Sequence, residues 1–563
     1  MQHADRIYIN GKIYTQSERG MVGAMALNGD KILYVGDDTA SALSLASTSC
    51  CVTDLAGRTI LPGFIDSHTH PSCVSLTKWR VILPHTYDLT ELLESAAAYC
   101  AAHPKEEVPF FNGECYYLSM FDEEGPKKEL LDEYISDRPA RIQDFTDHSC
   151  WYNSMALEMM GITKDVSDSD LFGDSPGEII RYPDGEPTGW VMEVPGNDLE
   201  IPMYEKLGWF PPMEATEDMV TPFLSFMNKS GVTALFDAFT CPENDMRMYY
   251  EMDQKGALHM YYEGSVLLTS SEPEDIAEAV QTARAWQEKY TSKHVHVNTI
   301  KVFLDGTNEL GDSGSLEPLR TDPSGEDYGM TYFTMEQLTD IIAALNEEGL
   351  DVHFHIVGDR TFRSACDAVE AARKICGGEL KIRVTCAHCE LVHPDDRHRP
   401  GELGININWS PHWSGGYFGD AAIQYLGKER FDTMYDFREM LSDGVNIAYS
   451  SDVFSYKEAN RAAPFFGISV GMTRIDPEIP LDPEKYPGSI RQPEGARMSL
   501  DELIYGYTMR GARQLGLEKE MGSLEKGKLA NYIILPKDPH ELNPDEIRTL
   551  VPDEVWLEGE RIC

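Results

Sequence analysis

The chain of 563 residues is long enough for a full barrel and a second domain, and its 42% hydrophobic and 25% charged residues are typical of a soluble globular protein. With 94 acidic and 48 basic side chains, the formal net charge is −46. Such a surface repels phosphate backbones and anionic lipid, so nucleic acid and membranes are not expected as partners, but the charge says little about the expected small-molecule substrate. Twelve scattered cysteines, no signal segment and no apolar run of about 18 residues predict a cytoplasmic protein. These features leave the oligomeric state open, with a homodimer as one option.

The two ends of the chain both contain short strand-like segments. The predicted strands are 6–9, 12–14, 24–27 and 31–35 near the N-terminus and 530–535 and 554–557 near the C-terminus. Asn10-Gly11 and Asn28-Gly29 are turn signals typical of a small antiparallel unit, which is too short to close a sandwich alone. We therefore expect one discontinuous β-sandwich domain built from residues 1–60 and 515–563.

The segment 59–71 ends in two histidines placed one residue apart. Side chains alternate between the faces of a strand, so His68 and His70 point the same way and can share one metal ion. Pro71 stops the strand, which places the pair at its C-terminal end, where a (β/α)8 barrel carries its chemistry. Two similar pairs occur later in the chain, so this pattern needs further ligands at later strand ends before it indicates a site.

Residues 71–210 show no regular alternation of strands and helices. Helices are predicted at 89–102 and 153–160, in a region rich in Gly, Pro and Asp. A βα unit needs only about 30 residues, so we expect this region to be an insertion that covers the active site and carries substrate specificity.

From residue 212 onward, strands and helices alternate regularly. Counted with the strand that ends at His68, the segments give the eight strands of a TIM barrel, expected over residues 61–514. The predicted fold class is therefore α/β, a (β/α)8 barrel with the terminal β-sandwich domain and a large insertion after barrel strand 1. The later strands are predicted at 232–236, 258–264, 298–304, 351–355, 382–388, 404–409 and 445–450.

Candidate metal ligands recur at the ends of these strands. They would converge at one rim of the barrel although they are spread over almost 400 residues of sequence. Imidazole, carboxylate and a carboxylated lysine suit zinc or a similar divalent first-row metal. The candidates are His68 and His70 on strand one, Lys301 on strand four, His355 on strand five, His388 on strand six and Asp452 after strand eight.

With these residues in place, the chain resembles the amidohydrolase superfamily, and more narrowly the branch of YtcJ-like proteins and N-substituted formamide deformylases. The matching motifs run in order along nearly the whole chain and are specific together, although each alone is weak. They include Leu61-Pro-Gly-Phe-Ile-Asp-Ser-His-Thr-His70, Asp147-His-Ser-Cys-Trp-Tyr-Asn153, Lys301-Val-Phe-Leu-Asp-Gly306, His355-Ile-Val-Gly-Asp-Arg360, Ala387-His-Cys-Glu390, Ser450-Ser-Asp452 and Gly522-Ser-Leu-Glu-Lys-Gly-Lys-Leu-Ala530.

The resemblance implies that the four strand-end histidines bind metal and that Asp452 contacts both metal and hydrolytic water. Lys301 matches a lysine that is carboxylated in binuclear relatives and bridges two metals. An unmodified lysine cannot do this, because its ammonium group has only donors. The sequence leaves open whether there are one or two ions, and a buried Lys301 paired with a carboxylate such as Asp305 is the alternative.

Two positions depart from the family pattern. Relatives usually have Glu-His-Ala-Gln where this chain has Ala387-His-Cys-Glu390. Cys386 and Cys389 form a single C-x-x-C, which without a second pair predicts neither a structural zinc site nor a redox motif. Ala530-Asn531 replaces the usual Ala-Asp, with no expected effect on catalysis.

The other two His-x-His pairs are His294/His296 and His353/His355. His294 and His296 precede the ligand position of strand four, so we expect ordinary strand or loop histidines. His353 shares a face with His355 but lies one layer deeper in the barrel. We expect it to pack or hydrogen-bond behind the ligands instead of binding metal.

His148 and His412 lie in segments that resemble substrate-contacting loops of the family. Both are candidate catalytic residues that would hydrogen-bond a substrate carbonyl or carboxylate, with simple solvent exposure as the alternative. Arg360 is expected either to bind an anionic group or to pair with a neighbouring carboxylate.

The expected function is hydrolysis of a C–N bond in an amide, formamide or N-acyl group by metal-activated hydroxide. Asp452 would take the water proton and pass it to the departing amine. Other superfamily reactions at the same site, on esters, cyclic amides or ring amines, or isomerisations, are the first alternative. A metal-free binding or scaffold protein is the second.

Overall fold

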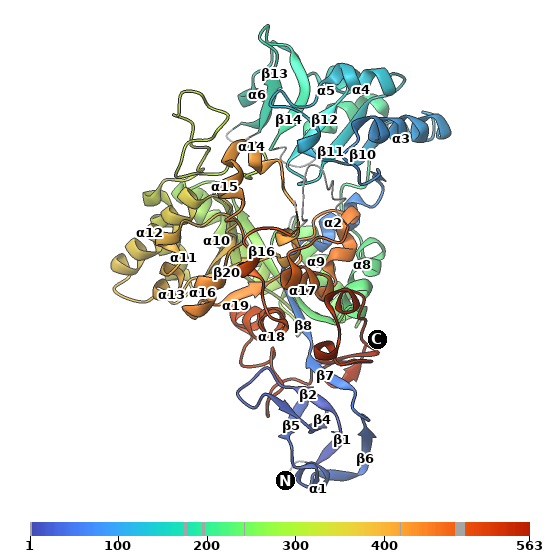
Figure 1. Ribbon diagram of the computed structural model, residues 1–563, viewed down its shortest axis with the longest axis vertical. Coiled ribbons are helices and arrows are strands. Elements are labelled where there is room, and N and C mark those ends of the chain that lie inside the picture. Colours follow the sequence, from blue (N-terminus) through green and yellow to red (C-terminus); the bar gives the residue numbers. More distant parts are fainter. Residues whose placement is uncertain (1–2, 174–176, 194–197, 241, 417, 479–489) are drawn as a thin grey trace.

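The chain is arranged in three parts along its long axis (Figure 1). A barrel-like parallel sheet lies in the middle, strands from both ends of the chain lie on one side of it, and an inserted α/β unit lies on the other. This arrangement is seen in a computed structural model that describes residues 3–173, 177–193, 198–240, 242–416, 418–478 and 490–563.

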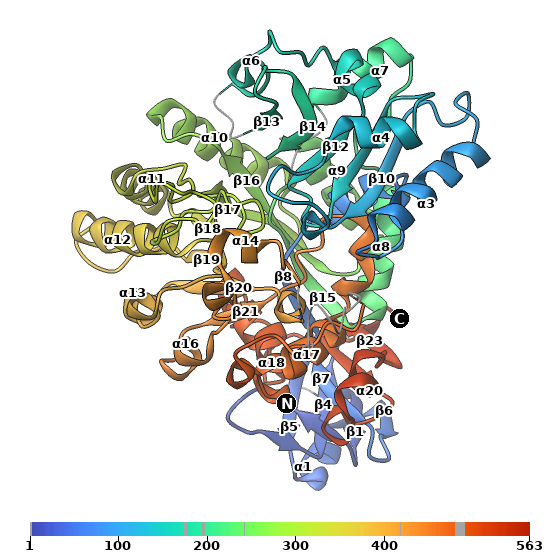
Figure 2. The same cartoon turned by 45° about the horizontal axis from the view of Figure 1, so that its top comes forward.

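The central sheet has eight parallel strands in the order β21-β20-β19-β18-β17-β16-β15-β8 (Figure 2). Hydrogen bonds join its two outer strands, because Ser67 Oγ donates to the carbonyl of Tyr449 at 2.8 Å and Asp452 N donates to the carbonyl of His68 at 2.8 Å. The predicted barrel is confirmed, with small shifts at the strand ends. The strands are β8 (Phe64–Thr69), β15 (Val232–Asp237), β16 (Tyr261–Leu268), β17 (Val295–Phe303), β18 (Asp351–Ile356), β19 (Val384–His388), β20 (Asn406–Trp409) and β21 (Ile447–Tyr449).

Strand β18 shows how side chains alternate between the helix-facing side of the barrel and its axis. All of its residues are buried, as expected for a parallel strand covered on both faces. Val352, Phe354 and Ile356 belong to the apolar core shared with the surrounding helices. Alternation sends His353 and His355 to the opposite face, toward the barrel axis.

Helices surround the barrel and carry clear end signals. For α11, the Thr334 side chain accepts the backbone N–H of Gln337 in a capping box, and the helix ends at Gly349 with φ 70°. No helix among the described residues has the length and apolar character needed to cross a membrane. The helices of the outer layer are α8 (Glu217–Lys229), α9 (Glu243–Gln254), α10 (Pro273–Tyr290), α11 (Met335–Glu348), α12 (Asp359–Ile375), α13 (Arg399–Leu403) and α16 (Arg438–Ser442). Shorter helices near the strand ends and the C-terminus are α2 (Pro71–Thr77), α14 (Ala422–Leu426), α15 (Lys428–Phe431), α17 (Pro464–Thr473), α18 (Leu500–Tyr505), α19 (Gly511–Leu515) and α20 (Pro544–Arg548).

The strands near the two termini form two sheets, in the orders β5-β4-β1-β6 and β24-β23-β22-β7-β2-β3. Strands from both ends of the chain thus pair in the second sheet, through β22 and β7. The prediction of an antiparallel N-terminal unit is wrong for one strand pair, because β1 pairs in parallel with β6. Strand β6 was not predicted, since it is largely exposed and shows no apolar alternation. The strands are β1 (Ala4–Ile9), β2 (Lys12–Tyr14), β3 (Met21–Val22), β4 (Ala24–Asn28), β5 (Lys31–Gly36), β6 (Ala46–Asp54), β7 (Thr59–Pro62), β22 (Tyr532–Leu535), β23 (Glu554–Leu557) and β24 (Glu560–Arg561), with helix α1 (Thr39–Ser44) beside them.

Gly63 is the junction between the terminal sheet and the barrel, since β7 ends at Pro62 and β8 begins at Phe64. A Cβ atom at this position would lie 2.3 Å from the Thr233 side chain. Glycine therefore allows β8 to lie close to β15 where the chain passes from one sheet to the other.

The inserted unit is more ordered than the sequence predicts. It contains a mixed sheet in the order β13-β14-β12-β11-β10-β9 and has apolar clusters of its own. Its strands were missed because several carry glycine or polar residues within them, as in β10 and β11, and show neither an apolar run nor a period of two. The elements are β9 (Val81–Ile82), α3 (Leu89–Ala102), β10 (Phe111–Tyr116), α4 (Lys128–Tyr134), β11 (Ala140–Asp144), β12 (Ser149–Tyr152), α5 (Ser154–Met160), α6 (Asp168–Phe172), β13 (Glu178–Arg181), β14 (Pro187–Met192) and α7 (Ile201–Leu207).

Candidate metal centre

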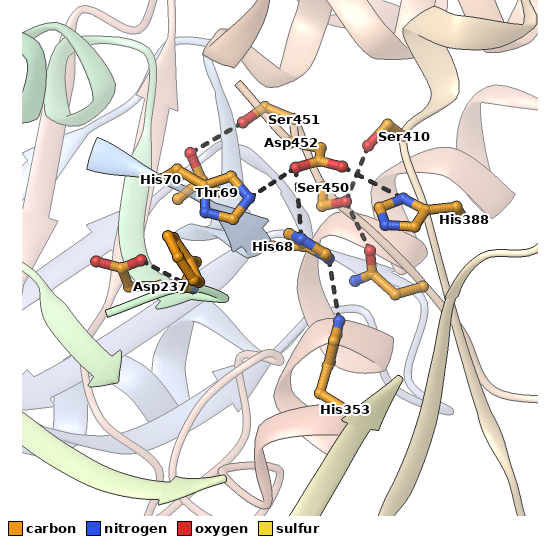
Figure 3. A network of polar contacts seen from close by, with 12 residues as sticks. His68, Thr69, His70, Asp237, His353, His388, Ser410, Ser450, Ser451 and Asp452 are labelled. Atoms are coloured by element: carbon orange, nitrogen blue, oxygen red, sulfur yellow. Dashed lines mark hydrogen bonds and ion pairs between the residues drawn. The ribbon is translucent and has the colours of Figure 1, made fainter. Parts of the chain in front are cut away.

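The carboxylate of Asp452 lies among three histidines at the carboxyl ends of the barrel strands (Figure 3). Its Oδ1 is 3.0 Å from His70 Nε2 and 3.4 Å from His68 Nε2. Its Oδ2 is 3.3 Å from His388 Nδ1. His68, His70 and Asp452 can each offer one ligand atom so that all three atoms lie within 4.8 Å of one another.

The backbone at this cluster is held in an unusual conformation. His388, Cys389 and Asp452 have φ angles of 71°, 46° and 47°, in the left-handed region that non-glycine residues rarely adopt. Asp66, buried one layer deeper on β8, accepts from the Ser451 N–H at 2.9 Å and from its hydroxyl at 2.6 Å. The segment that carries Asp452 is therefore tied to the strand that carries His68.

The histidines of this cluster are suited to bind a metal ion. Burial lowers the pKa of His68 and His388 well below the ordinary value, so both are neutral imidazoles with a lone pair to offer. His70 Nδ1 and His388 Nε2 are buried and have no hydrogen-bond partner in the described part of the chain. Three imidazoles and one carboxylate in a buried site form a donor set that fits zinc.

His353 lies behind the cluster, where its Nε2 is 3.0 Å from His68 Nδ1 (Figure 3). Burial lowers the pKa of His353 well below the ordinary value. The hydrogen bond fixes the ring orientation of His68 and directs the other nitrogen of His68 toward Asp452. This geometry agrees with the position expected for His353 one layer below the ligands.

His355 lies beside His388, with ring centroids 4.4 Å apart, but unlike His68, His70 and His388 it forms no ion pair with Asp452. Its Nε2 is 3.4 Å from the carbonyl oxygen of Gly306. Burial lowers the pKa of His355 well below the ordinary value. His355 therefore lies at the edge of the cluster, and its Nδ1 is the ring nitrogen that does not face the Gly306 carbonyl.

Lys301 is 1% exposed inside the barrel, and burial lowers its pKa to about 7. No hydrogen bond or ion pair of its Nζ is found among the described residues, and the Nζ lies 4.8 Å from the Phe303 ring centroid. The alternative pairing with Asp305 is not formed, because Asp305 instead accepts three backbone N–H groups at 2.9 to 3.1 Å.

His148 reaches the cluster from the inserted unit, where its ring lies 6.1 Å from the ring of His355. Its Nδ1 is 3.0 Å from Glu193 Oε1. Burial opposes a charge on His148, but the Glu193 carboxylate outweighs it and the pKa is raised to about 10. Glu193 was not predicted from the sequence, because it follows β14 in a loop without any motif.

A model of the amidohydrolase family matches residues 52–563 of the chain. The chain belongs to the amidohydrolase family. The family predicted from the sequence motifs is thereby confirmed.

This amidohydrolase has curated relatives along most of its length. It is 25% identical over 452 residues to the exoenzymes regulatory protein AepA of Pectobacterium carotovorum, covering 79% of this chain and 93% of that one. It is 24% identical over 574 residues to the N-substituted formamide deformylase of Arthrobacter pascens, covering 99% and 98% of the two chains.

Solved structures share the fold of this amidohydrolase. An uncharacterized metal-dependent hydrolase from Pyrococcus furiosus matches with a TM-score of 0.64 and 22% identity, covering 95% of this chain and 99% of that one. At this identity the likeness describes the fold.

His412 lies buried beside the segment that carries Asp452 in this amidohydrolase. The ring is fully buried, and its Nε2–H donates to the Ser451 carbonyl at 2.6 Å. Its Nδ1 is 3.3 Å from Arg461 Nη1, and burial together with Arg461 lowers the pKa of His412 to about 3. Both ring nitrogens of His412 thus face protein partners, one of which lies in the segment that carries Asp452.

Several other sequence candidates lie outside the cluster. His294 binds Asp253 at 2.6 Å, in keeping with an ordinary structural histidine. Arg360 donates to the backbone carbonyls of Tyr328 and Gly329, and no carboxylate pairs with it among the described residues. Cys386 and Cys389 are buried and free.

Proposed function

We propose that this amidohydrolase is a metal-dependent hydrolase that cleaves the C–N bond of an amide, formamide or N-acyl compound. The observation that supports this proposal best is the carboxylate of Asp452, whose side chain is 10% exposed, among the imidazoles of His68, His70 and His388. The residues proposed to hold the ion or ions are His68, His70, His355, His388, Asp452 and Lys301.

We propose zinc as the metal because imidazole nitrogen and carboxylate oxygen are its usual ligands. When bound, such an ion polarises a carbonyl and lowers the pKa of water from near 16 to about 7. Two ions are expected if Lys301 is carboxylated. Its pKa of about 7 supports this, since an uncharged amine is the form that can add carbon dioxide.

The roles of the protein side chains follow from their positions. Asp452 takes the proton of the attacking water and returns it to the departing nitrogen, because an amide anion is a very poor leaving group. His148, held as a cation by Glu193, donates a hydrogen bond to the substrate oxygen as negative charge develops on it.

The remaining proposals concern the whole protein. The domain boundaries are 1–60 with 515–563 for the composite β-sandwich domain and 61–514 for the barrel, with residues 71–210 covering the active site. We also propose a small-molecule substrate, a cytoplasmic location and a homodimeric assembly.

The test is amine release from a panel of N-formyl and N-acetyl amines. The protein is purified without chelator, and the amine and acid products are quantified together. The proposal expects equal amounts of both products and a release that is about 10²- to 10⁴-fold slower in Asp452→Asn. Turnover confined to esters or to ring deamination would refute C–N cleavage of acyl compounds and favour another reaction at the same cluster.

A further inference from the structure

A buried ion pair joins the inserted sheet to the segment that follows Asp452. The Nζ of Lys457 donates to Asp147 Oδ1 at 2.8 Å and to the Asp144 carbonyl at 3.2 Å. The Lys457 and Asp147 side chains are 0% and 10% exposed. A charge pair this well shielded from water has one preferred geometry, so it fixes the spacing between the two segments.

The turn that Lys457 contacts is the one that carries His148. It connects β11 and β12, and the Asp144 carboxylate accepts two of its backbone N–H groups. Asp147, next to His148, has a left-handed backbone with φ 65°. The contact with Lys457 therefore acts on the residue adjacent to the ring that faces His355.

On its other side, Lys457 belongs to the same connection as Asp452. This connection makes a second buried contact with the inserted unit, because Ser455 Oγ donates to Glu114 Oε2 at 2.6 Å. Arg80 in turn donates to Glu114 Oε1 at 2.5 Å. The segment after Asp452 is thus held by carboxylates of the inserted sheet and not only by the barrel.

We propose that Lys457 is a positioning residue that keeps the turn of His148 in register with the segment of Asp452. The catalytic part of this inference rests on the proposed function, whereas its structural part does not. Without the pair, the two segments can shift relative to each other, and a displacement of about 1 Å at a reacting group can cost about 100-fold in rate.

The kinetic test separates position from stability. Lys457→Met leaves a buried, unpaired Asp147, which lowers both stability and kcat. In Asp147→Asn/Lys457→Met, neutral groups replace both charges, so the melting temperature recovers. For this double variant, we expect kcat on the best substrate of the amine-release panel to stay about 100-fold below the wild-type value, with KM within about twofold of it. The single variant Lys457→Arg, which keeps the positive charge, should retain most of the wild-type kcat. Recovery of kcat together with the melting temperature in the double variant would overturn the proposal.

A second measurement needs no substrate. Hydrogen exchange in the full-length protein is expected to rise about tenfold or more in residues 145–149 of the double variant, with little change elsewhere. Arg138→Met is the matched control, because Arg138 is buried in the same inserted unit but donates to the carbonyls of Cys100, His103 and Val108 and pairs with the exposed carboxylate of Asp137. Unchanged exchange at 145–149, or an equal rise in the control, contradicts the positioning role even if the proposed reaction is wrong.

Discussion

At the scale of single residues, Asp452 differs from the histidines around it because its proposed role includes a proton transfer. Asp452→Asn keeps an oxygen toward the histidines but cannot accept the proton, so we expect kcat to fall about 10²- to 10⁴-fold while most of the metal remains bound. Rates and metal content are measured on the same preparation. Asp395→Asn, with an 83% exposed side chain, is the control. Full activity in Asp452→Asn would contradict the role.

The pH dependence of the rate tests the pair of His148 and Glu193. The pKa of His148 is raised to about 10, so its cation is present below that pH and is lost as the pH rises through it. In Glu193→Gln the stabilising charge is gone, and the pKa should move toward the ordinary value of about 6.5. We expect the alkaline fall of kcat to begin at lower pH in this variant. Superimposable pH profiles would show that His148 does not act as a cation.

At the scale of elements, the junction between β7 and β8 positions the strand that carries the first two histidines. In Gly63→Ala the new methyl group meets Thr233, and we expect a loss of about 1–3 kcal/mol in the free energy of unfolding. Gly23→Ala is the matched control, because no atom lies within 4 Å of its Cβ position and a change below about 0.5 kcal/mol is expected. Urea denaturation of both variants measures the difference. Equal losses of unfolding free energy in the two variants would show that the close contact between Gly63 and Thr233 does not matter for stability.

The barrel strands could be predicted from sequence because segments rich in apolar residues alternate with helical patterns, and several of them end at a polar residue. His355 and His388 were found this way, since a parallel barrel gathers strand ends whatever their distance in sequence. The inserted sheet was missed because strands such as β10 and β11 contain glycine and polar residues and show neither an apolar run nor a period of two. Strand β6 was missed for the opposite reason, since it is mostly exposed and polar.

At the scale of the whole molecule, the C-terminal strands contact the barrel through Glu558. This carboxylate binds Tyr261, Lys293 and His294. Burial raises the pKa of Glu558, but its three partners outweigh this and lower it to about 2. Burial likewise opposes a charge on His294, but Glu558 and Asp253 raise its pKa.

The stability of this contact should depend on pH with a defined sign. The Glu558 contribution is present above about pH 4.5 and is lost as the pH falls toward 2, whereas the His294 contribution is present below about pH 6.5 and is lost as the pH rises through its raised pKa. We expect the melting temperatures of wild type and Glu558→Gln to differ most between about pH 4.5 and 6.5, where both contributions are present. The difference should shrink toward pH 9, with a remainder from Lys293. A difference that stays constant from pH 5 to 9 would contradict this.

Some site residues could not be predicted because they depend on contacts between distant segments. Glu193 carries no motif, and its role arises only because the inserted sheet brings it beside His148. The burial of His412 behind Ser451 depends on Arg461 and could not be read from its loop sequence. The family motifs indicate which side chains meet at the barrel rim, and the tertiary contacts determine which of them remain free for a substrate.

The central claim is that the cluster around Asp452 binds a catalytic metal, and metal analysis tests it most directly. Protein purified without chelator should contain at least about one equivalent of zinc or a similar divalent ion per chain. A folded His68→Ala/His70→Ala variant should lose most of it, whereas His393→Ala, whose side chain is 39% exposed, should not. Less than about half an equivalent in the wild type, or the same content in the double variant, would contradict the account.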